Sequence, residues 1–389
     1  MNLTSFSFPT KILYGAGAIR ELRIFLGQLG VRRPLVVTDA GFKATPAFAA
    51  LVSSLGHAPA GAAPAGSDWV LFADVHANPV ESDVREAAKS YLAGGCDGVV
   101  AIGGGSPLDA GKAARLLVRR PGFGLEHFYD EPDWSGLAPL VAIPTTAGTG
   151  SEVGRSSVIT LDSTRRKAVL FHPGLLASQV ILDPELTLGL PPNLTAATGA
   201  DALTHCIESY TCPVFHPMCD GIALEGIRII AEALPRAYRD GSDIDARGRM
   251  QVAATMGGVA FQKDLGVVHS LAHPLSTVCG LHHGLANALC LVAGMRFCSA
   301  GKPGIYRRVG AACGLELAGM RDTDADRATI AFLEEFLGGL GLRSRLSEHG
   351  VSRAHLDALV EQAFADPCHR TNVVPVTRDE LRALYVEVI

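Results

Sequence analysis

The fold is decided by the stretch Val99-Val-Ala-Ile-Gly-Gly-Gly-Ser-Pro-Leu-Asp-Ala-Gly-Lys112, in which an apolar strand runs through three glycines directly into a helical segment. Glycine permits positive φ angles and close backbone approach. The N-terminus of the following helix presents unpaired N–H groups and the positive end of its dipole, which favour an anion such as a pyrophosphate. Three glycines alone are a weak signal, because an ordinary tight turn has the same composition. The stretch therefore predicts a βα unit with a candidate phosphate cradle.

Short runs rich in β-branched residues alternate with helical segments over the first half of the chain. The expected strands are residues 34–38, 98–102, 140–143 and 180–182. A helical segment, residues 84–92, lies between the first two of them. This alternation is typical of βαβ units and predicts an α/β domain with a mostly parallel sheet.

The pattern changes near residue 186 to long helical periods with almost no strand signal. The expected helices are residues 194–210, 220–237, 246–262 and 327–337. Prolines at 184, 191 and 192 mark the change, because proline interrupts helices and sheets alike. With 389 residues the chain exceeds what one core usually supports. We predict a dinucleotide-binding α/β domain over residues 1–185 and an all-α metal-binding domain over residues 186–389.

Composition narrows the classes of partner. The formal net charge is −5 and the basic residues are scattered, so no basic surface for nucleic acid or an anionic membrane is expected. We find no secretory leader pattern and no run of about 18 apolar residues, which predicts a cytoplasmic protein without a membrane span. Nine cysteines without a CxxC pair predict free thiols, and Cys206, Cys290 and Cys298 are expected in the core. A small-molecule partner is favoured.

Two further segments support a nucleotide site. Pro144-Thr-Thr-Ala-Gly-Thr-Gly-Ser151 follows an apolar strand and supplies hydroxyls and flexible glycines at the sheet edge where ligands of open α/β sheets bind. Asp39 follows the strand at 34–38, where its carboxylate can accept hydrogen bonds from both ribose hydroxyls of an adenosine. This position disfavours a 2′-phosphate and predicts NAD rather than NADP. The alternative for Asp39 is a solvated turn residue.

Histidines with ligand spacing are concentrated in the second half. Asp201 and His205 lie four apart on one face of a helical segment, and His269 and His273 repeat this spacing. Two more histidines follow a glycine at residues 282–283. Neutral imidazoles with one carboxylate suit a divalent ion of borderline softness and leave room for a substrate oxygen. We expect Fe(II) or Zn(II), and the pattern does not choose between them.

A single histidine is more often a core or capping residue than a ligand. We expect this role for His172, His216 and His282, because intermediate burial is normal for histidine. The set between residues 205 and 283 differs, since it is embedded in apolar helices where an unpaired imidazole is costly to bury. The sequence therefore predicts that a common partner satisfies this set.

Over its whole length the chain resembles the iron-containing, or group III, alcohol dehydrogenases. The segments that carry the resemblance are residues 6–17, 103–109, 145–152, 201–205, 269–274 and 283–287. Residues 186–192, 220–225 and 368–372 look most like the branch that contains 4-hydroxybutyrate dehydrogenases. The loop at residues 277–282 matches no single substrate class, so the substrate stays open.

The resemblance implies that the N-terminal domain holds the dinucleotide and the helical domain holds the metal. The implied metal ligands are Asp201, His205, His269 and His283. His273 would lie beside the reacting carbon and the cofactor rather than on the metal. The implied dinucleotide contacts are Asp39, Gly104, Gly105, Ser106, Asp109, Thr145, Thr146, Thr149 and Lys167.

These expectations describe a metal-dependent oxidoreductase that transfers hydride between NAD(H) and a small primary alcohol or aldehyde, with an ω-hydroxy acid and its semialdehyde as one candidate pair. His273 is the candidate to relay the alcohol proton, because imidazole titrates near working pH. An acid group on the substrate could pair with Arg155, Arg370 or His172. Ser156 and Cys368 are candidates for lining the substrate pocket.

Two other classes use a similar scaffold. One is the sugar-phosphate cyclases and polyol-phosphate dehydrogenases, against which the motif at residues 145–152 argues. The other is a non-catalytic assembly subunit, which would tolerate loss of ligands and glycines that this chain retains. The helical domain also predicts a homodimer or larger homo-oligomer, without fixing its symmetry.

Overall fold

The computed structural model describes residues 8, 10–56, 68–131 and 133–389, so the start of the N-terminal motif at residues 6–7 lies outside the described residues. The chain divides into an N-terminal unit, residues 8–146 and 150–189, and a C-terminal unit with residues 147–149 and 190–389. The predicted boundary after residue 185 falls inside a short 3-10 helix, Pro184–Thr187. Asp183 caps this turn and also accepts the backbone N–H groups of Gly17 and Ile19, which keeps the turn with the N-terminal unit.

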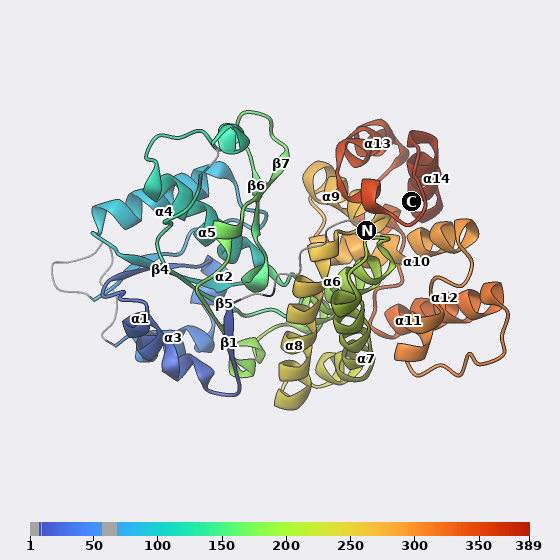
Figure 1. Cartoon of the computed structure of the whole chain (residues 1–389), viewed down its shortest axis with the longest axis horizontal. Helices are drawn as coiled ribbons and strands as arrows, with labels where there is room; N and C mark the ends of the chain where they lie inside the picture. The colour runs from blue at the N-terminus through green and yellow to red at the C-terminus, as the bar shows by residue number, and fades with distance from the viewer. Residues whose placement is uncertain (1–7, 9, 57–67, 132) are drawn as a thin grey trace. The chain divides into compact units, whose positions relative to one another are not determined.

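A six-stranded parallel sheet forms the centre of the N-terminal unit (Figure 1). Its strand order is β1-β8-β5-β4-β2-β3, and every neighbouring pair is parallel. The strands are β1 (Lys11–Tyr14), β2 (Pro34–Val37), β3 (Val70–Phe72), β4 (Gly98–Gly103), β5 (Leu140–Pro144) and β8 (Gln179–Leu182). The predicted parallel α/β sheet is confirmed, and each predicted strand lies within about one residue of an observed one.

Helices cover both faces of this sheet. Val36, Val100 and Val141 lie in one core with residues of α1 (Leu22–Gln28) and α3 (Pro46–Leu55). On the other face Gly111 of α5 (Gly105–Arg119) packs against Ala101. Side chains alternate along each strand, so a strand covered on both faces must be apolar throughout. The remaining helices of this unit are α2 (Ala40–Lys43) and α4 (Glu81–Ala93).

A separate antiparallel hairpin was not predicted from the sequence. It consists of β6 (Ser156–Thr160) and β7 (Lys167–Phe171), which pair from Ser156 with Phe171 to Thr160 with Lys167. Its strands are only partly buried and carry polar residues, so they lack the continuous apolar run that marks the central strands.

The C-terminal unit is helical throughout its described residues, as predicted (Figure 1). Its helices are α6 (Pro192–Thr211), α7 (Pro217–Arg239), α8 (Ile244–Ala260), α9 (Val267–Cys279), α10 (His283–Gly301), α11 (Arg307–Ala312), α12 (Asp322–Gly339), α13 (Leu356–Ala365) and α14 (Arg378–Val388). Helix α6 is buried along almost its whole length, and α7, α8 and α10 pack around it. Side chains on α6 are therefore held in the centre of the unit.

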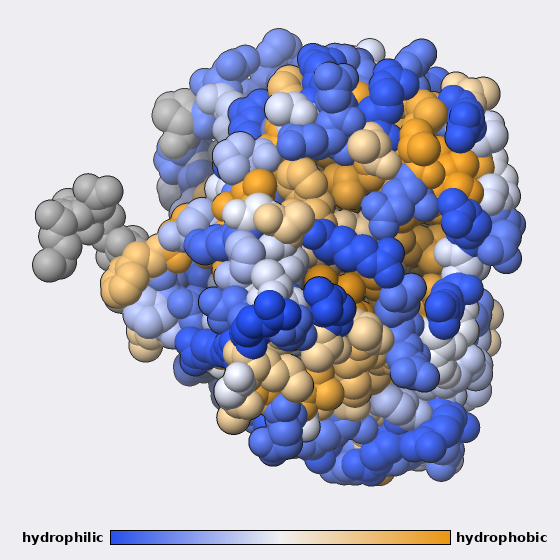
Figure 2. Space-filling model, turned by 90° about the vertical axis from the view of Figure 1, so that its right-hand side faces the viewer, coloured by the Kyte–Doolittle hydropathy of each residue, from blue (hydrophilic) through white to orange (hydrophobic). Residues whose placement is uncertain are grey.

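One helix is more apolar than the sequence analysis anticipated. By length and composition α10 could cross a membrane, but 61% of its apolar window is buried, as in the core helix of a folded domain. The surface on the side of the C-terminal helices mixes hydrophilic and apolar residues (Figure 2). All nine cysteines are free, and Cys206, Cys290 and Cys298 are buried as expected.

Candidate metal centre and nucleotide cradle

Helix α6 supplies the first two candidate ligands from adjacent turns. Asp201 and His205 lie four residues apart, so their side chains share a face of the helix. His269, in the first turn of α9, meets them there: one ligand atom from each of these three residues lies within 4.8 Å of the others. All three side chains are at most 5% exposed. The predicted i,i+4 pair and a histidine 64 residues further along the chain thus converge in the core.

Helix α10 brings the fourth candidate ligand. His283 is the first residue of α10, and its Nε2 lies 3.5 Å from Oδ1 of Asp201. The imidazole rings of His269 and His283 lie 5.5 Å apart between centroids. With 24% of its side chain exposed, His283 lies on the more open side of the cluster. The four residues implied as metal ligands are therefore neighbours in the structure.

The polar groups around this cluster fit a cation. The amide nitrogen of Asn287 lies 2.7 Å from Asp201 Oδ1 and 3.2 Å from Nε2 of both His269 and His283. An amide nitrogen carries two N–H bonds and cannot donate to three acceptors. The Asn287 oxygen is itself buried without a hydrogen-bond partner. One carboxylate and three imidazoles are also the donor set expected for a divalent transition-metal ion.

Electrostatics shift the pKa values of two imidazoles of the cluster in opposite directions. Burial lowers the pKa of His205 to about 4 and outweighs the attraction of Asp201, so this imidazole is neutral and able to coordinate. Burial also acts to lower the pKa of His269. The hydrogen bond to Glu208 and the charges of Glu208 and Asp201 outweigh it, and the pKa of His269 is raised. A metal ion can take the place of that proton.

His273 lies one turn after His269 on α9 and has a different partner. Its Nδ1 is 2.7 Å from Oδ2 of Asp366. The other oxygen of this carboxylate, Oδ1, accepts hydrogen bonds from Ser270 Oγ at 2.8 Å and Cys368 N at 2.9 Å. Burial acts to raise the pKa of Asp366, but the charge and hydrogen bond of His273 and the other donors lower it overall. The imidazole of His273 stacks on that of His283 with centroids 5.3 Å apart. His273 is thus adjacent to the candidate ligand His283 and is oriented by a carboxylate.

The candidate nucleotide cradle lies where three neighbouring strands end. The strands β2, β4 and β5 are adjacent and parallel, so their carboxyl ends lie at one edge. The chain order reverses between β2 and β4, because β3 lies beyond β2 while β5 and β8 lie beyond β4. Ligands of open α/β sheets bind at such a switch point. The predicted cofactor contacts at residues 39, 104–106 and 145–146 follow these three strands.

The turn between β4 and α5 requires a glycine at position 103. Gly103 has a φ of 144°, and a Cβ there would lie 2.7 Å from Cγ of Pro107 and 3.1 Å from Oδ2 of Asp39. The other carboxylate oxygen of Asp39 accepts the backbone N–H of Phe42 at 2.8 Å and caps α2. A Cβ at Gly104 would lie 3.5 Å from the Thr146 methyl group. These contacts place Asp39, the glycine turn and Thr146 around one point.

Asp109 has contacts within the N-terminal unit that the sequence did not indicate. One turn into α5, its Oδ1 accepts from Ser151 Oγ at 2.6 Å and its Oδ2 from Val158 N at 3.0 Å. The buried ammonium of Lys112 donates to Ser151 Oγ at 2.9 Å and Ser156 O at 2.8 Å. Burial raises the pKa of Asp109 and lowers that of Lys112, each against the attraction of the other. Asp109 thus anchors the β6–β7 hairpin to α5, and its predicted nucleotide contact stays a prediction.

Several predicted residues are not brought together within one unit. Thr149 groups with the C-terminal unit, unlike the other predicted dinucleotide contacts. Among the substrate candidates, Arg155 and Ser156 belong to the N-terminal unit and Cys368 and Arg370 to the C-terminal unit. The guanidinium of Arg155 lies 5.7 Å from the centroid of the Phe171 ring. Lys167 begins β7, where its charge acts on Asp109.

Two other histidines have the capping role expected of them. His172 accepts the backbone N–H of Gly174, and His216 accepts that of Cys219 at the start of α7. His282 occupies the N-cap position of α10 without a side-chain cap hydrogen bond.

Three polar residues near the cluster were missed by the sequence analysis. They are Glu208, Asn287 and Asp366. Glu208 lies three residues after His205 and Asn287 four after His283, so helical spacing could have placed both on the ligand faces. Asp366 is 93 residues from His273, and no local spacing links them.

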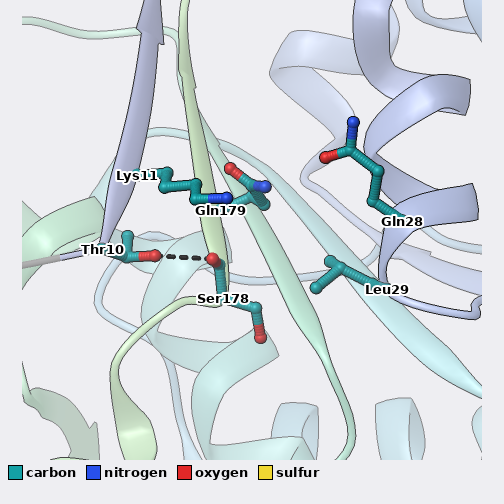
Figure 3. Close-up of a pocket in the computed structure, with 6 residues that line it drawn as sticks. All are labelled: Thr10, Lys11, Gln28, Leu29, Ser178 and Gln179. Atoms are coloured by element: carbon teal, nitrogen blue, oxygen red, sulfur yellow. Dashed lines mark hydrogen bonds between the residues drawn. The ribbon is translucent and has the colours of Figure 1, made fainter.

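A hollow elsewhere in the N-terminal unit is unrelated to this chemistry. It is lined by Thr10, Lys11, Gln28, Leu29, Ser178 and Gln179 (Figure 3). Lys11 and Gln179 begin strands β1 and β8, whereas the cradle forms at the ends of strands. The hollow holds none of the predicted site residues.

Comparison with known proteins decides the family. A model described as iron-containing alcohol dehydrogenase matches residues 9–184, and one described as the C-terminal part of the same family matches residues 195–389. The chain belongs to the iron-containing alcohol dehydrogenase family. It is an oxidoreductase that acts on alcohols, and the predicted resemblance is confirmed.

Individual relatives match along nearly the whole chain. A 4-hydroxybutyrate dehydrogenase of Cupriavidus necator is 40% identical and covers 94% of both chains. An NAD-dependent methanol dehydrogenase of Bacillus methanolicus is 32% identical and covers 95% of this chain and 96% of its own. The crystal structure of a 1,3-propanediol oxidoreductase is 31% identical, with a TM-score of 0.92 over 100% of both chains.

Proposed function

We propose that the chain interconverts a small primary alcohol and its aldehyde, with NAD as hydride carrier and Fe(II) as the bound metal. The observation that carries this proposal is the convergence of Asp201, His205 and His269 within 4.8 Å, with His283 beside them. Family membership supports iron, and the name of the methanol dehydrogenase supports NAD. Zn(II) suits the same donor set and is the alternative metal.

Asp201, His205, His269 and His283 would hold the metal. When bound, a divalent ion supplies Lewis acidity that lowers the pKa of an alcohol and polarises an aldehyde carbonyl. The buried side chains of α6 and α9 exclude water from one side of this site, and the exposed edge of His283 leaves the other side open to substrate. The protein thereby orients the reacting oxygen.

His273 would move the alcohol proton. Asp366 accepts from Nδ1 of His273, so the tautomer that donates this hydrogen leaves Nε2 free to accept a proton. Stacking on His283 keeps the ring beside the proposed ligand. The arrangement resembles the histidine–carboxylate pairs of other general bases, in which the carboxylate orients the ring.

The dinucleotide would bind at the carboxyl ends of β2, β4 and β5. The glycine turn and the N-terminus of α5 offer N–H groups to the pyrophosphate, with Ser106, Thr145 and Thr146 as hydroxyl donors. Asp39 would accept from the adenosine ribose, which favours NAD over NADP. The nicotinamide supplies the hydride chemistry itself.

The substrate would be a short ω-hydroxy acid or its semialdehyde. The relative with 40% identity, named 4-hydroxybutyrate dehydrogenase, supports this choice. Arg370, the exposed residue of the turn Cys368–Thr371, and Arg155, beside Phe171, are the proposed partners of the acid group. Ser156 and Cys368 are the further candidates for substrate contacts. We also infer a cytoplasmic homo-oligomer, which size-exclusion chromatography with light scattering tests.

The test is turnover of an aldehyde panel by metal-free protein reconstituted anaerobically with Fe(II) or Zn(II). The panel contains succinic semialdehyde, lactaldehyde, glycolaldehyde and simple alkanals, and NADH consumption is followed. We expect metal-dependent turnover with the highest kcat/KM for succinic semialdehyde. Tight NADH binding without turnover of any aldehyde, with either metal, would instead favour a sugar-phosphate cyclase, a polyol-phosphate dehydrogenase or a non-catalytic assembly subunit.

A further inference from the structure

Glu208 is a buried carboxylate behind the proposed metal ligands. It lies on α6 three residues after His205 and is 5% exposed. Its Oε2 lies 2.6 Å from Nδ1 of His269 and accepts the backbone N–H of the same residue at 3.3 Å, while Oε1 accepts Val268 N at 2.7 Å. Both oxygens of this carboxylate are thus directed at the first turn of α9.

The first role of Glu208 is to cap helix α9 from a neighbouring helix, α6. The N-cap residue of α9 is Gly266, which has no side chain to accept the first N–H groups. Glu208 accepts two of them, and Asn372 accepts that of Val267 at 3.1 Å. A Cβ at Gly266 would lie 2.7 Å from both Glu208 Oε1 and Asn372 Oδ1. The glycine therefore makes room for the two side chains that replace its own cap.

The second role concerns the tautomer of His269. An ionised carboxylate only accepts hydrogen bonds, so the short contact to Glu208 requires the hydrogen on Nδ1 of His269. The opposite nitrogen, Nε2, then points its lone pair toward the cluster, where Asn287 lies 3.2 Å away. Carboxylates that hold a metal-binding imidazole in this way set its orientation and raise its basicity.

We propose that Glu208 is a positioning residue of the metal centre, which fixes both the start of α9 and the tautomer that turns Nε2 of His269 toward Asp201 and His205. Glu208 lies on α6 together with Asp201 and His205. This one helix therefore positions two proposed ligands directly and a third, His269, through Glu208. This inference rests on the proposed metal site. Glu208 itself touches neither substrate nor metal.

A purely structural cap and a positioning residue predict different behaviour for Glu208→Gln. The amide oxygen of glutamine can still accept Val268 N–H, whereas the backbone N–H of His269 loses its acceptor, so half of the cap remains. Its amide nitrogen would donate to Nδ1 of His269, which places the ring hydrogen on Nε2 and opposes coordination. A cap alone predicts a loss of stability with metal affinity unchanged, whereas a positioning role predicts a loss of affinity in a folded protein.

The experiment titrates Co(II) into metal-free wild type, Glu208→Gln and Glu208→Asp, with visible absorption and chelator competition as readouts. Asp243→Asn is the matched control, because Asp243 caps α8 by accepting the backbone N–H of Ala246 at 3.0 Å and α8 contains no proposed metal ligand. We expect Co(II) to bind roughly 10- to 100-fold more weakly to Glu208→Gln, with an altered spectrum. The control should bind like wild type, and thermal unfolding of each metal-free protein reports its folding.

Wild-type affinity in a folded Glu208→Gln protein would overturn the inference and leave the proposed function intact. If Glu208→Gln does not fold, Glu208→Asp decides, because it keeps the negative charge but shortens the side chain by one methylene. Weaker Co(II) binding with a shifted spectrum supports positioning, and unchanged binding overturns it. Failure of the wild type to bind metal would instead remove the proposed metal site, and this inference with it.

Discussion

Asp201 contributes the negative charge of the proposed ligand set, while the other three members are imidazoles. We expect Asp201→Asn to lower metal affinity and aldehyde reduction by more than about 100-fold, because the change removes that charge at nearly constant volume. Metal content by mass spectrometry and NADH consumption test this. Asp326→Asn removes a buried carboxylate that binds Ser299 and two backbone N–H groups elsewhere in the unit, and it should retain its metal.

His273 offers a test that separates proton transfer from metal binding. His273→Asn should keep the metal but lower kcat by about 10²- to 10⁴-fold and flatten the pH dependence of alcohol oxidation. His282→Asn, next to a proposed ligand but not assigned to proton transfer, is the control. An unchanged pH profile in a metal-loaded His273→Asn protein would exclude the relay.

Asp366 gives a prediction for stability against pH. Its pKa is lowered in the folded protein, so the stabilisation from its contacts is present above the unfolded-state value of about 3.9 and is lost as the pH falls through the lower folded value. Asp366→Asn in the metal-free protein should be less stable near neutral pH and lose stability less steeply below about pH 4. Urea unfolding at a series of pH values measures both. Equal acid slopes in variant and wild type would contradict this.

Among the elements, the turn between β4 and α5 combines a positive φ with close packing. Gly103→Ala should weaken NADH binding and cost about 1–3 kcal/mol of stability, because its backbone conformation and the contact with Pro107 both disfavour a Cβ. Gly122→Ala is the matched control: Gly122 has a φ of 83° but a Cβ there meets nothing within 4 Å. NADH fluorescence titration should show a raised Kd for the first variant alone.

The elements that sequence analysis located share strong local patterns. Central strands such as β4 are buried on both faces, and α6 begins at a proline after an extended segment, so apolar runs and breakers marked both. The β6–β7 hairpin was missed because polar residues interrupt its apolar runs, at Ser156, Ser157 and Thr160 in β6 and at Lys167 in β7. Asp366 was missed for another reason, because its partner His273 lies 93 residues away in sequence. Spacing from His205 could have placed Glu208 on the ligand face, but its contact with His269 spans 61 residues and has no local pattern.

For the whole molecule, similarity to alcohol dehydrogenases extends over both units. The 1,3-propanediol oxidoreductase structure covers 100% of this chain, and the family models together span residues 9–184 and 195–389. The ligand motifs were readable because four of the five residues around the proposed centre come from two i,i+4 pairs. The substrate could not be predicted in the same way, because the side chains proposed to bind its acid group are single residues divided between the two units.

Metal-dependent hydride transfer is tested by following one deuterium atom. Fe(II)-loaded protein is given NADH deuterated at the transferred position of C4 together with succinic semialdehyde, and the alcohol product is analysed by mass spectrometry. We predict one deuterium on the carbinol carbon, with no transfer by metal-free protein. Product that forms without this deuterium, or equal transfer by metal-free protein, would contradict metal-dependent hydride transfer from the nicotinamide.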